Sequence, residues 1–278
     1  MHGVKILSKA LILAALLSMV PAAQAGSVWV RGVTAEGGWH DADKSLDKDG
    51  DLCWATTAAN MVAWWQGLHP RETAAGKAPR GLAAVWQEFR NAFRDGLGST
   101  YYCLRWWLAG ERPPEQMKLA PQAQAHRGYA PAPLREQDLI MYKAPEFDGS
   151  GDISATLRGL LEKGYSVALG LRKFDAQHYV KPGGHMISLW GLDYDDATGT
   201  VTRLYVTDSD DVIGTWPQYQ KGLFSADCTP VPDLKYSGGA PFRGLALSNK
   251  LKWFRGETTI TTIVALHADA ALPPAKQK

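Results

Sequence analysis

Helical and strand patterns occupy different halves of the chain, and this order constrains the fold more than any other feature. Apolar residues at helical spacing define three segments that begin near Cys53, Leu82 and Ile153. Apart from a short strand pattern in residues 26–38, the strand-like segments follow the helical ones, at residues 165–171, 185–194, 201–207 and 258–266. Strands that are not alternated with helices argue against a βαβ architecture. The sequence therefore predicts an α+β fold, with an N-terminal helical half and a C-terminal antiparallel sheet.

The first 25 residues have the features of a secretory signal peptide. Lys5 and Lys9 form a basic start, residues 10–20 are almost wholly apolar, and Ala23-Gln24-Ala25 has the form of a cleavage site. The apolar run is shorter than the roughly 20 residues that a membrane-spanning helix needs. We therefore expect the signal to be cleaved and the protein to be secreted or periplasmic, without a membrane anchor.

Composition limits the partners of the remaining chain. The formal net charge is +2, and no cluster of Lys and Arg is present, which argues against nucleic-acid binding. Apolar residues make up 45% of the chain, enough for a sizeable core. We expect residues 26–268 to form one domain, and the small, polar, proline-containing segment 269–278 to be a disordered tail.

One of the cysteines, Cys53, lies where the first helical pattern begins, and Asp51 is placed to cap that helix. Unpaired N–H groups and the helix dipole stabilise an anion at a helix N-terminus, which lowers the pKa of a thiol and can receive an oxyanion. A buried structural role is the common alternative for a lone cysteine. The polar residues 47–51 that precede Cys53 argue for the reactive role.

Turn residues around positions 196 and 197 separate two strand patterns. An antiparallel hairpin centred there sets His185 opposite Asp208, with Asp210 two residues further on the same face. A carboxylate fixes the tautomer and orientation of an imidazole, and an imidazole can hold a thiol as thiolate. Cys53, His185 and Asp208 therefore form a candidate catalytic set, and Asp210 is kept beside Asp208 as a second acid.

Each of these residues also has an ordinary interpretation. A histidine at the start of a strand is commonly just a polar residue. The acidic run that begins at Asp208 could be a solvated turn, or could bind a hard cation through its oxygens. His40 and His178 are rival bases, although neither lies in a comparable hairpin.

Two segments resemble the IgG-degrading cysteine endopeptidases of the IdeS/Mac type, a branch of the papain-like fold. Residues 184–193 read Gly-His-Met-Ile-Ser-Leu-Trp-Gly-Leu-Asp, where that family has His-Val-Ile-Asn-Leu-Trp-Gly-Ala-Asp. Residues 204–210 read Leu-Tyr-Val-Thr-Asp-Ser-Asp, where the family has Ile-Tyr-Val-Thr-Asp-Ser-Asp. The segment from Trp39 to Trp65 is similar to the family's nucleophile region, whereas residues 66–150 show no alignable similarity.

The resemblance implies a papain-like cysteine protease in which Cys53 is the nucleophile, His185 the base, Asp208 the orienting acid and Asp210 a supporting acid. Lys44 falls close to a lysine that helps to form the family's oxyanion hole. A secreted, virulence-related endopeptidase is implied, with a protein substrate such as a host immunoglobulin. We expect neither a cofactor nor a metal site.

The chain has three cysteines, an odd number for an exported protein. If Cys53 is kept as a reactive thiol, Cys103 and Cys228 are the natural candidates for a disulfide bridge, although all three could instead be reduced or buried. Two other functions stay open. One is an acyl-transfer enzyme, either an amidase or transglutaminase-like, on the same residues. The other is a non-catalytic module that binds a protein or glycan through its aromatic residues.

Overall fold

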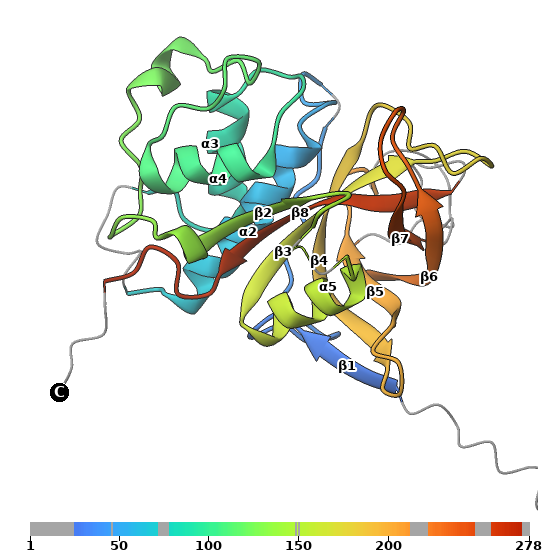
Figure 1. Cartoon of the computed structure of the whole chain (residues 1–278). Helices are drawn as coiled ribbons and strands as arrows, with labels where there is room; N and C mark the ends of the chain where they lie inside the picture. Colours follow the sequence, from blue (N-terminus) through green and yellow to red (C-terminus); the bar gives the residue numbers. More distant parts are fainter. Residues whose placement is uncertain are drawn as a thin grey trace, which may run out of the picture.

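The computed structural model describes residues 25–45, 47–71, 78–147, 149, 151–211, 222–247 and 257–273. These residues form eight strands and four α-helices (Figure 1). The strands are β1 (Ala25–Trp29), β2 (Leu139–Lys143), β3 (Tyr165–Lys173), β4 (His185–Asp195), β5 (Val201–Thr207), β6 (Phe224–Leu234), β7 (Phe242–Leu247) and β8 (Thr258–His267). The α-helices are α2 (Cys53–Leu68), α3 (Leu82–Ala92), α4 (Thr100–Ala109) and α5 (Ile153–Glu162). Two short 3-10 helices, η1 (Pro121–Ala125) and η2 (Glu136–Asp138), precede β2.

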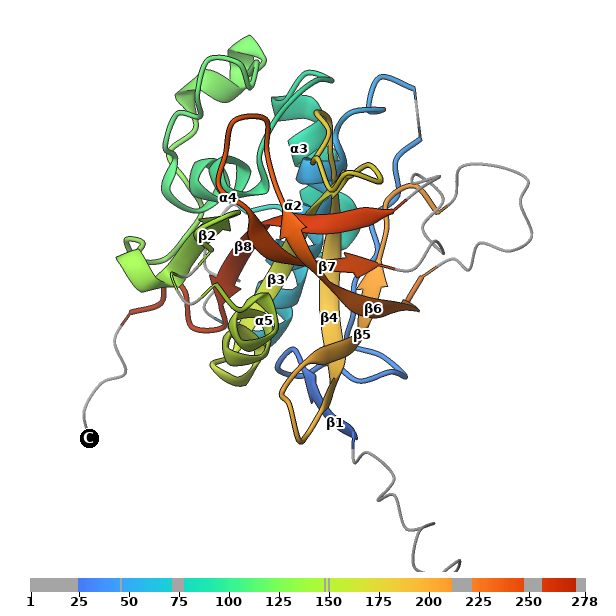
Figure 2. The same ribbon diagram turned by 45° about the vertical axis from the view of Figure 1, so that its right-hand side comes forward.

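Six of the strands close into an antiparallel barrel. Their order is β4-β3-β8-β7-β6-β5, and β5 pairs back with β4 (Figure 2). Strand β1 adds to β4, and β2 adds to β8. Closure leaves none of the six barrel strands as a free edge, which removes the pairing surface that exposed edges present to other chains.

The predicted papain-like α+β fold is wrong, because the described structure is mostly β and is organised around this closed barrel. Sequence patterns missed three strands, β2, β6 and β7, and the last two complete the ring. Strand β6 contains Pro230 and Pro232, and proline cannot donate a hydrogen bond to a neighbouring strand. The pairing of β6 with β7 shifts register between Val231 and Leu234, next to these prolines.

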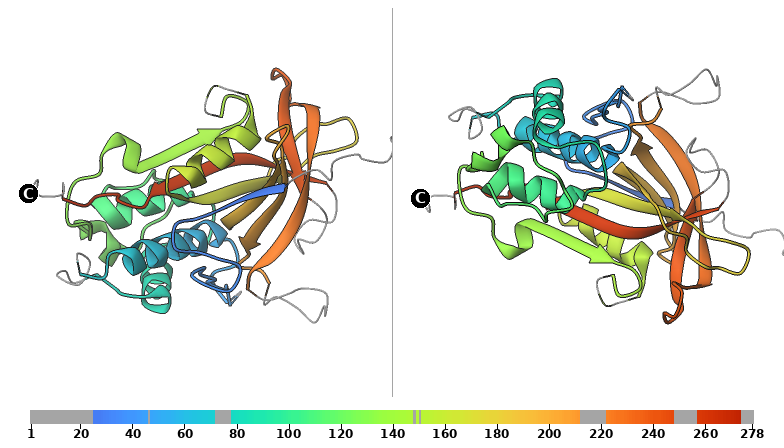
Figure 3. Two further views of the ribbon diagram at one scale, coloured as in Figure 1. Left: turned by 90° about the horizontal axis from the view of Figure 1, so that it is seen from below. Right: turned by 90° about the horizontal axis from the view of Figure 1, so that it is seen from above.

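Helix α2 is the central helix of the part of the molecule that lies outside the barrel. Its residues are buried from Cys53 to Gln66, as expected of a helix that is covered on all sides. Helices α3 and α4 pack on α2, and strands β3 and β4 contact it from the barrel. Figure 3 shows these helices gathered at one end of the molecule and β5, β6 and β7 at the other. The helices predicted to begin near Cys53, Leu82 and Ile153 are confirmed as α2, α3 and α5.

The ends of the chain depart from expectation in one respect. Ala270 and Ala271 are fully buried, and the Trp65 indole N–H donates to the Ala270 carbonyl at 3.0 Å. The prediction of a disordered tail from residue 269 is therefore wrong for these residues. Residues 274–278, and residues 1–24 of the predicted signal, lie outside the described residues. Within the described part of the chain, none of the helices has the length and apolar character to cross a bilayer.

Barrel closure can be tested at Gly244 in β7. A Cβ at this position would lie 2.2 Å from Leu234 Cδ1 of β6 and 2.6 Å from Thr259 Oγ1 of β8. We expect Gly244→Ala to lower the free energy of unfolding by about 1–3 kcal/mol through overpacking. Thermal unfolding measures this, since about 1 kcal/mol corresponds to roughly 2–4 °C in Tm at this chain length.

Gly159→Ala in α5 is the matched control, because a Cβ there meets no atom within 4 Å. Alanine favours a helix over glycine by about 1 kcal/mol, so its Tm should be equal or higher. Equal Tm values for the two variants would contradict the packing of β7 between β6 and β8.

Candidate active site

Cys53 is the first residue of α2, but the predicted cap is wrong. The residue that precedes the helix is Leu52, and no side chain caps the helix N-terminus. The Asp51 backbone N–H instead donates to Asp95 Oδ1 at 2.7 Å. The N-terminal N–H groups of α2 are thus left without a side-chain acceptor, directly beside the Cys53 thiol.

The loop before Cys53 is held by a buried carboxylate, Asp49. Its Oδ2 accepts hydrogen bonds from the Ser45 N–H and hydroxyl, both at 3.0 Å, and lies 3.1 Å from Arg90 Nε of α3. The Leu52 N–H donates to the Asp49 carbonyl at 3.1 Å. These contacts fix the turn from which α2 starts.

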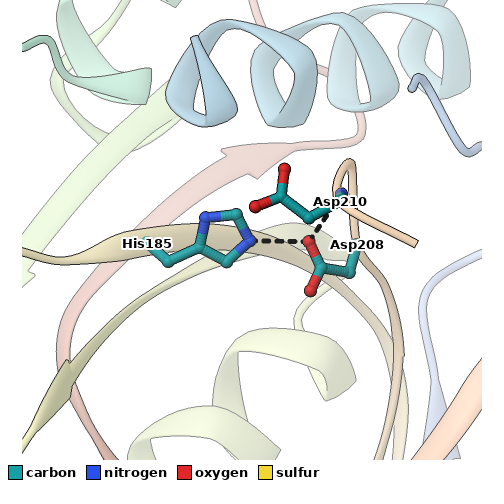
Figure 4. A group of neighbouring side chains, drawn as sticks. All are labelled: His185, Asp208 and Asp210. Atoms are coloured by element: carbon teal, nitrogen blue, oxygen red, sulfur yellow. Dashed lines mark hydrogen bonds and ion pairs between the residues drawn. The ribbon is translucent and has the colours of Figure 1, made fainter. Parts of the chain in front are cut away.

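His185 and Asp208 meet as predicted. His185 is the first residue of β4, and Asp208 directly follows β5. Figure 4 shows the contact between His185 Nε2 and Asp208 Oδ1, which measures 2.6 Å. The same oxygen accepts the Asp210 backbone N–H at 3.0 Å. Both side chains are almost fully buried.

The hairpin register that led to this prediction is nevertheless wrong. In that register Ser188 would face Tyr205, but the structure pairs Ser188 with Thr207. The pairing of β4 with β5 is irregular at two points, and toward His185 it ends at the Ser188–Thr207 pair. A turn after Thr207, closed by the Asp211 N–H on the Asp208 carbonyl at 3.0 Å, brings the Asp208 carboxylate to the imidazole.

Lys44 and Asp210 form a second buried pair in the same cluster. Lys44 Nζ lies 2.6 Å from Asp210 Oδ1, and their side chains are 2% and 1% exposed. The ammonium also donates to the Gly50 carbonyl at 2.6 Å, and the Lys44 N–H donates to the Ser209 carbonyl at 3.1 Å. Within the described residues, the Asp210 carboxylate accepts no hydrogen bond, and the Lys44 ammonium is its ion-pair partner. Lys44 thus ties the loop before Cys53 to the loop that carries Asp208.

The environment separates the pKa values of the reactive groups. Burial alone would raise the pKa of the Cys53 thiol, but the charge and hydrogen bond of His185 lower it below its ordinary value, helped by the Met186 N–H and Lys44. Burial opposes the charged form of His185, yet Asp208 and Cys53 raise its pKa well above the usual range. Burial would raise the pKa of Asp208, and His185 holds it below normal.

These shifts favour a thiolate beside an imidazolium. Since Nε2 of His185 is occupied by Asp208, the nitrogen that remains for the thiol is Nδ1. The arrangement can therefore supply a nucleophilic sulfur, and a proton on the opposite side of the ring from the orienting carboxylate.

The other candidate residues lie elsewhere. His40 packs edge-on against Trp190, and His178 packs against Phe174, so neither rival base is the partner of Cys53. The predicted Cys103–Cys228 bridge is wrong, because both cysteines are free. Cys103 lies in α4 among the helices and Cys228 lies in β6 of the barrel.

A second acidic group was missed, although the runs of Asp that supply it are visible in the sequence. Carboxylate oxygens of Asp41, Asp43 and Asp211 lie within 4.8 Å of one another and could hold a cation. His185, Asp208 and Asp210 lie equally close, but these groups already contact one another or Lys44. Burial, followed by the charges of Asp211 and Asp43, raises the pKa of Asp41 to about 8.

Comparison with known proteins does not assign the chain to a family. The chain matches no protein-family model, and no curated protein matches it. The geometry of the site and the sequence motifs therefore carry the functional argument.

The raised pKa of Asp41 predicts that stability falls as the pH rises. The folded protein keeps the Asp41 proton up to about pH 8, whereas the unfolded chain loses it near the ordinary value of 3.8. Unfolding then releases a proton between these values, so the free energy of unfolding decreases from about pH 4 to pH 8. Asp41→Asn should reduce the difference in Tm between pH 5 and pH 8. Asp196→Asn, in an exposed turn, is the control and should leave that difference unchanged. If Asp41→Asn leaves the Tm difference unchanged, the Asp41 proton is not the cause of the pH dependence of stability.

Proposed function

We propose that the protein is a secreted cysteine endopeptidase that cleaves a protein substrate through Cys53, His185 and Asp208. The observation that carries the proposal is the buried His185 imidazole between a thiol of lowered pKa and a carboxylate at 2.6 Å. Perturbed pKa values in a set of contacting groups are typical of catalytic sites. The resemblance of residues 184–193 and 204–210 to the IdeS/Mac endopeptidases supports peptide-bond hydrolysis as the reaction.

In the proposed reaction, Cys53 Sγ attacks the carbonyl carbon of a peptide bond. The carbonyl oxygen becomes an oxyanion, and the His185 imidazolium then donates its proton to the leaving amine as the C–N bond breaks. Water attacks the resulting thioester with His185 as base, which releases the carboxylic acid and restores the thiolate. Asp208 holds the imidazole in the orientation and tautomer that both steps need.

The oxyanion is stabilised by the N-terminal N–H groups of α2, which have no side-chain cap. Lys44 adds positive charge, since it is close enough to lower the pKa of the thiol. Its ammonium is held by Asp210 and the Gly50 carbonyl. We therefore assign Lys44 an electrostatic role, supported by Asp210, in stabilising both the thiolate and the developing oxyanion.

The pH dependence of thiol alkylation tests the Cys53–His185 pair. The pKa of Cys53 is lowered and that of His185 is raised, so the two groups favour a thiolate–imidazolium pair. We expect iodoacetamide to modify Cys53 almost as fast at pH 6 as at pH 8. In His185→Ala the rate at pH 6 should fall roughly 100-fold or more, since a thiol of pKa about 8.5 is less than about 1% ionised there.

Mass spectrometry of the Cys53 peptide measures the rate, and the same digest contains its controls. Burial raises the pKa of Cys103 well above its normal value and that of Cys228 to about 12, so both should stay unmodified. Equal Cys53 rates in wild type and His185→Ala would remove the basis for the proposed catalysis.

Proteolysis is tested with immunoglobulin G, which the sequence resemblance suggests, and with denatured casein as a general protein substrate. The wild-type protein should produce discrete fragments, and Cys53→Ala should slow their formation by a factor on the order of 10³ or more. An unchanged Tm in Cys53→Ala separates lost chemistry from lost folding. Fragments formed equally by both proteins would point to a contaminating protease. A fast thiol that cleaves neither substrate, but transfers acyl groups to an added amine, would contradict hydrolysis.

A further inference from the structure

An exposed leucine, Leu97, lies on the loop between α3 and α4, and this loop contacts residues on either side of Cys53 in the sequence. Leu97 is 83% exposed, and Tyr179, at 39%, is the other large hydrophobic side chain that is exposed in the described part of the chain. Single exposed apolar residues are common on protein surfaces. The position and support of Leu97, rather than its exposure alone, therefore carry the argument.

The loop between α3 and α4 is attached to the start of α2 by two contacts that precede Leu97. Asp95 Oδ1 accepts the Asp51 N–H at 2.7 Å, and the Gly96 carbonyl accepts the Trp54 indole N–H at 3.0 Å. These two donors lie within two residues of Cys53 in the sequence. The loop is thus fixed to the start of the nucleophile helix by contacts from its backbone and side chains.

The residue after Leu97 brings the loop still closer. A Cβ on Gly98 would lie 2.1 Å from the Trp54 ring, so only glycine permits this approach. Two residues further, the Thr100 hydroxyl donates to the Trp54 carbonyl at 2.9 Å. Leu97 is therefore held in place by its neighbours while its own side chain remains uncovered, and a preorganised surface loses little freedom when it binds a ligand.

We propose that Leu97 is a specificity-determining residue that binds a large apolar side chain of an extended polypeptide, next to the peptide bond that Cys53 attacks. The proposal rests on the proposed function. Cys53 is only 8% exposed, which favours an extended segment over a folded surface as the group that reaches it. The apolar contact removes the exposed Leu97 side chain from water, which favours binding.

Tyr179 provides the matched control. It lies in the β3–β4 loop, the yellow segment on the barrel side in Figure 1. Its N–H donates to Asp175 Oδ1 at 2.9 Å, and the Lys235 ammonium lies 4.5 Å from the centre of its ring. One ring face is thus already occupied, and within the described residues Tyr179 contacts its own loop and Lys235.

The test compares two electrophiles at Cys53, iodoacetamide and N-benzyl iodoacetamide. Both react by displacement of iodide by the thiolate, and they differ in the apolar benzyl group. The ratio of their rate constants, divided by the same ratio for free cysteine, measures apolar binding beside the thiol. We expect this normalised ratio to be about tenfold in wild type and to approach one in Leu97→Ser. Leu97→Met should largely restore it, and Tyr179→Ser should leave it at the wild-type value.

The iodoacetamide rate itself should be the same in all these proteins, since none of the substitutions touches the Cys53–His185 pair. A wild-type ratio near one, or an equal loss in Leu97→Ser and Tyr179→Ser, would overturn the role of Leu97. If iodoacetamide modifies Cys53 slowly at pH 6, the proposed function fails. The ratio measured at pH 9, where any accessible thiol is ionised, then still decides whether Leu97 binds the apolar group.

Discussion

The contact between α2 and the barrel is the constraint on which the site depends. Helix α2 packs against β3 and β4, and Asn60 joins the two layers. Its Nδ2 donates to the Ser188 hydroxyl of β4 at 3.0 Å, while its Oδ1 accepts the Ala42 N–H at 2.9 Å. Because one helical turn advances about 5.4 Å, a shift of α2 by a single turn would separate Cys53 from His185. The buried bridge at Asn60 opposes that shift.

The site is also a set of buried charges that stabilise one another. Removal of one member of a buried ion pair costs several kcal/mol, because the other is left uncompensated in a poorly polarisable environment. Here Lys44 faces Asp210, while His185 lies between Asp208 and the Cys53 thiol. The Lys44 ammonium also favours the charged forms of Asp208 and Cys53. The supporting pair and the reactive pair are therefore one electrostatic unit.

Local signals in the sequence predicted the positions of the candidate site residues better than the architecture. The start of α2 at Cys53 and the His185–Asp208 contact follow from helical spacing and from two strand patterns joined by a turn. The closed barrel depends on β6 and β7. Pro230 and Pro232 prevented the prediction of β6, because proline is rare within strands and occurs there mainly at edges, strand starts and bulges. The exact register failed for a similar reason, since the irregular pairing of β4 with β5 has no signature in composition.

The three cysteines show how environment moves the pKa of one residue type in opposite directions. An odd count suggested a bridge plus a free thiol, yet each cysteine is free. Among the described residues, no cation lowers the pKa of Cys103 or Cys228, and burial raises the pKa of both. Cys53 is also buried, but His185 and Lys44 reverse the effect of burial. The pKa of Cys53 therefore depends on Lys44 in the preceding loop and on His185 in β4, far along the chain. A local motif around the cysteine is insufficient to predict it.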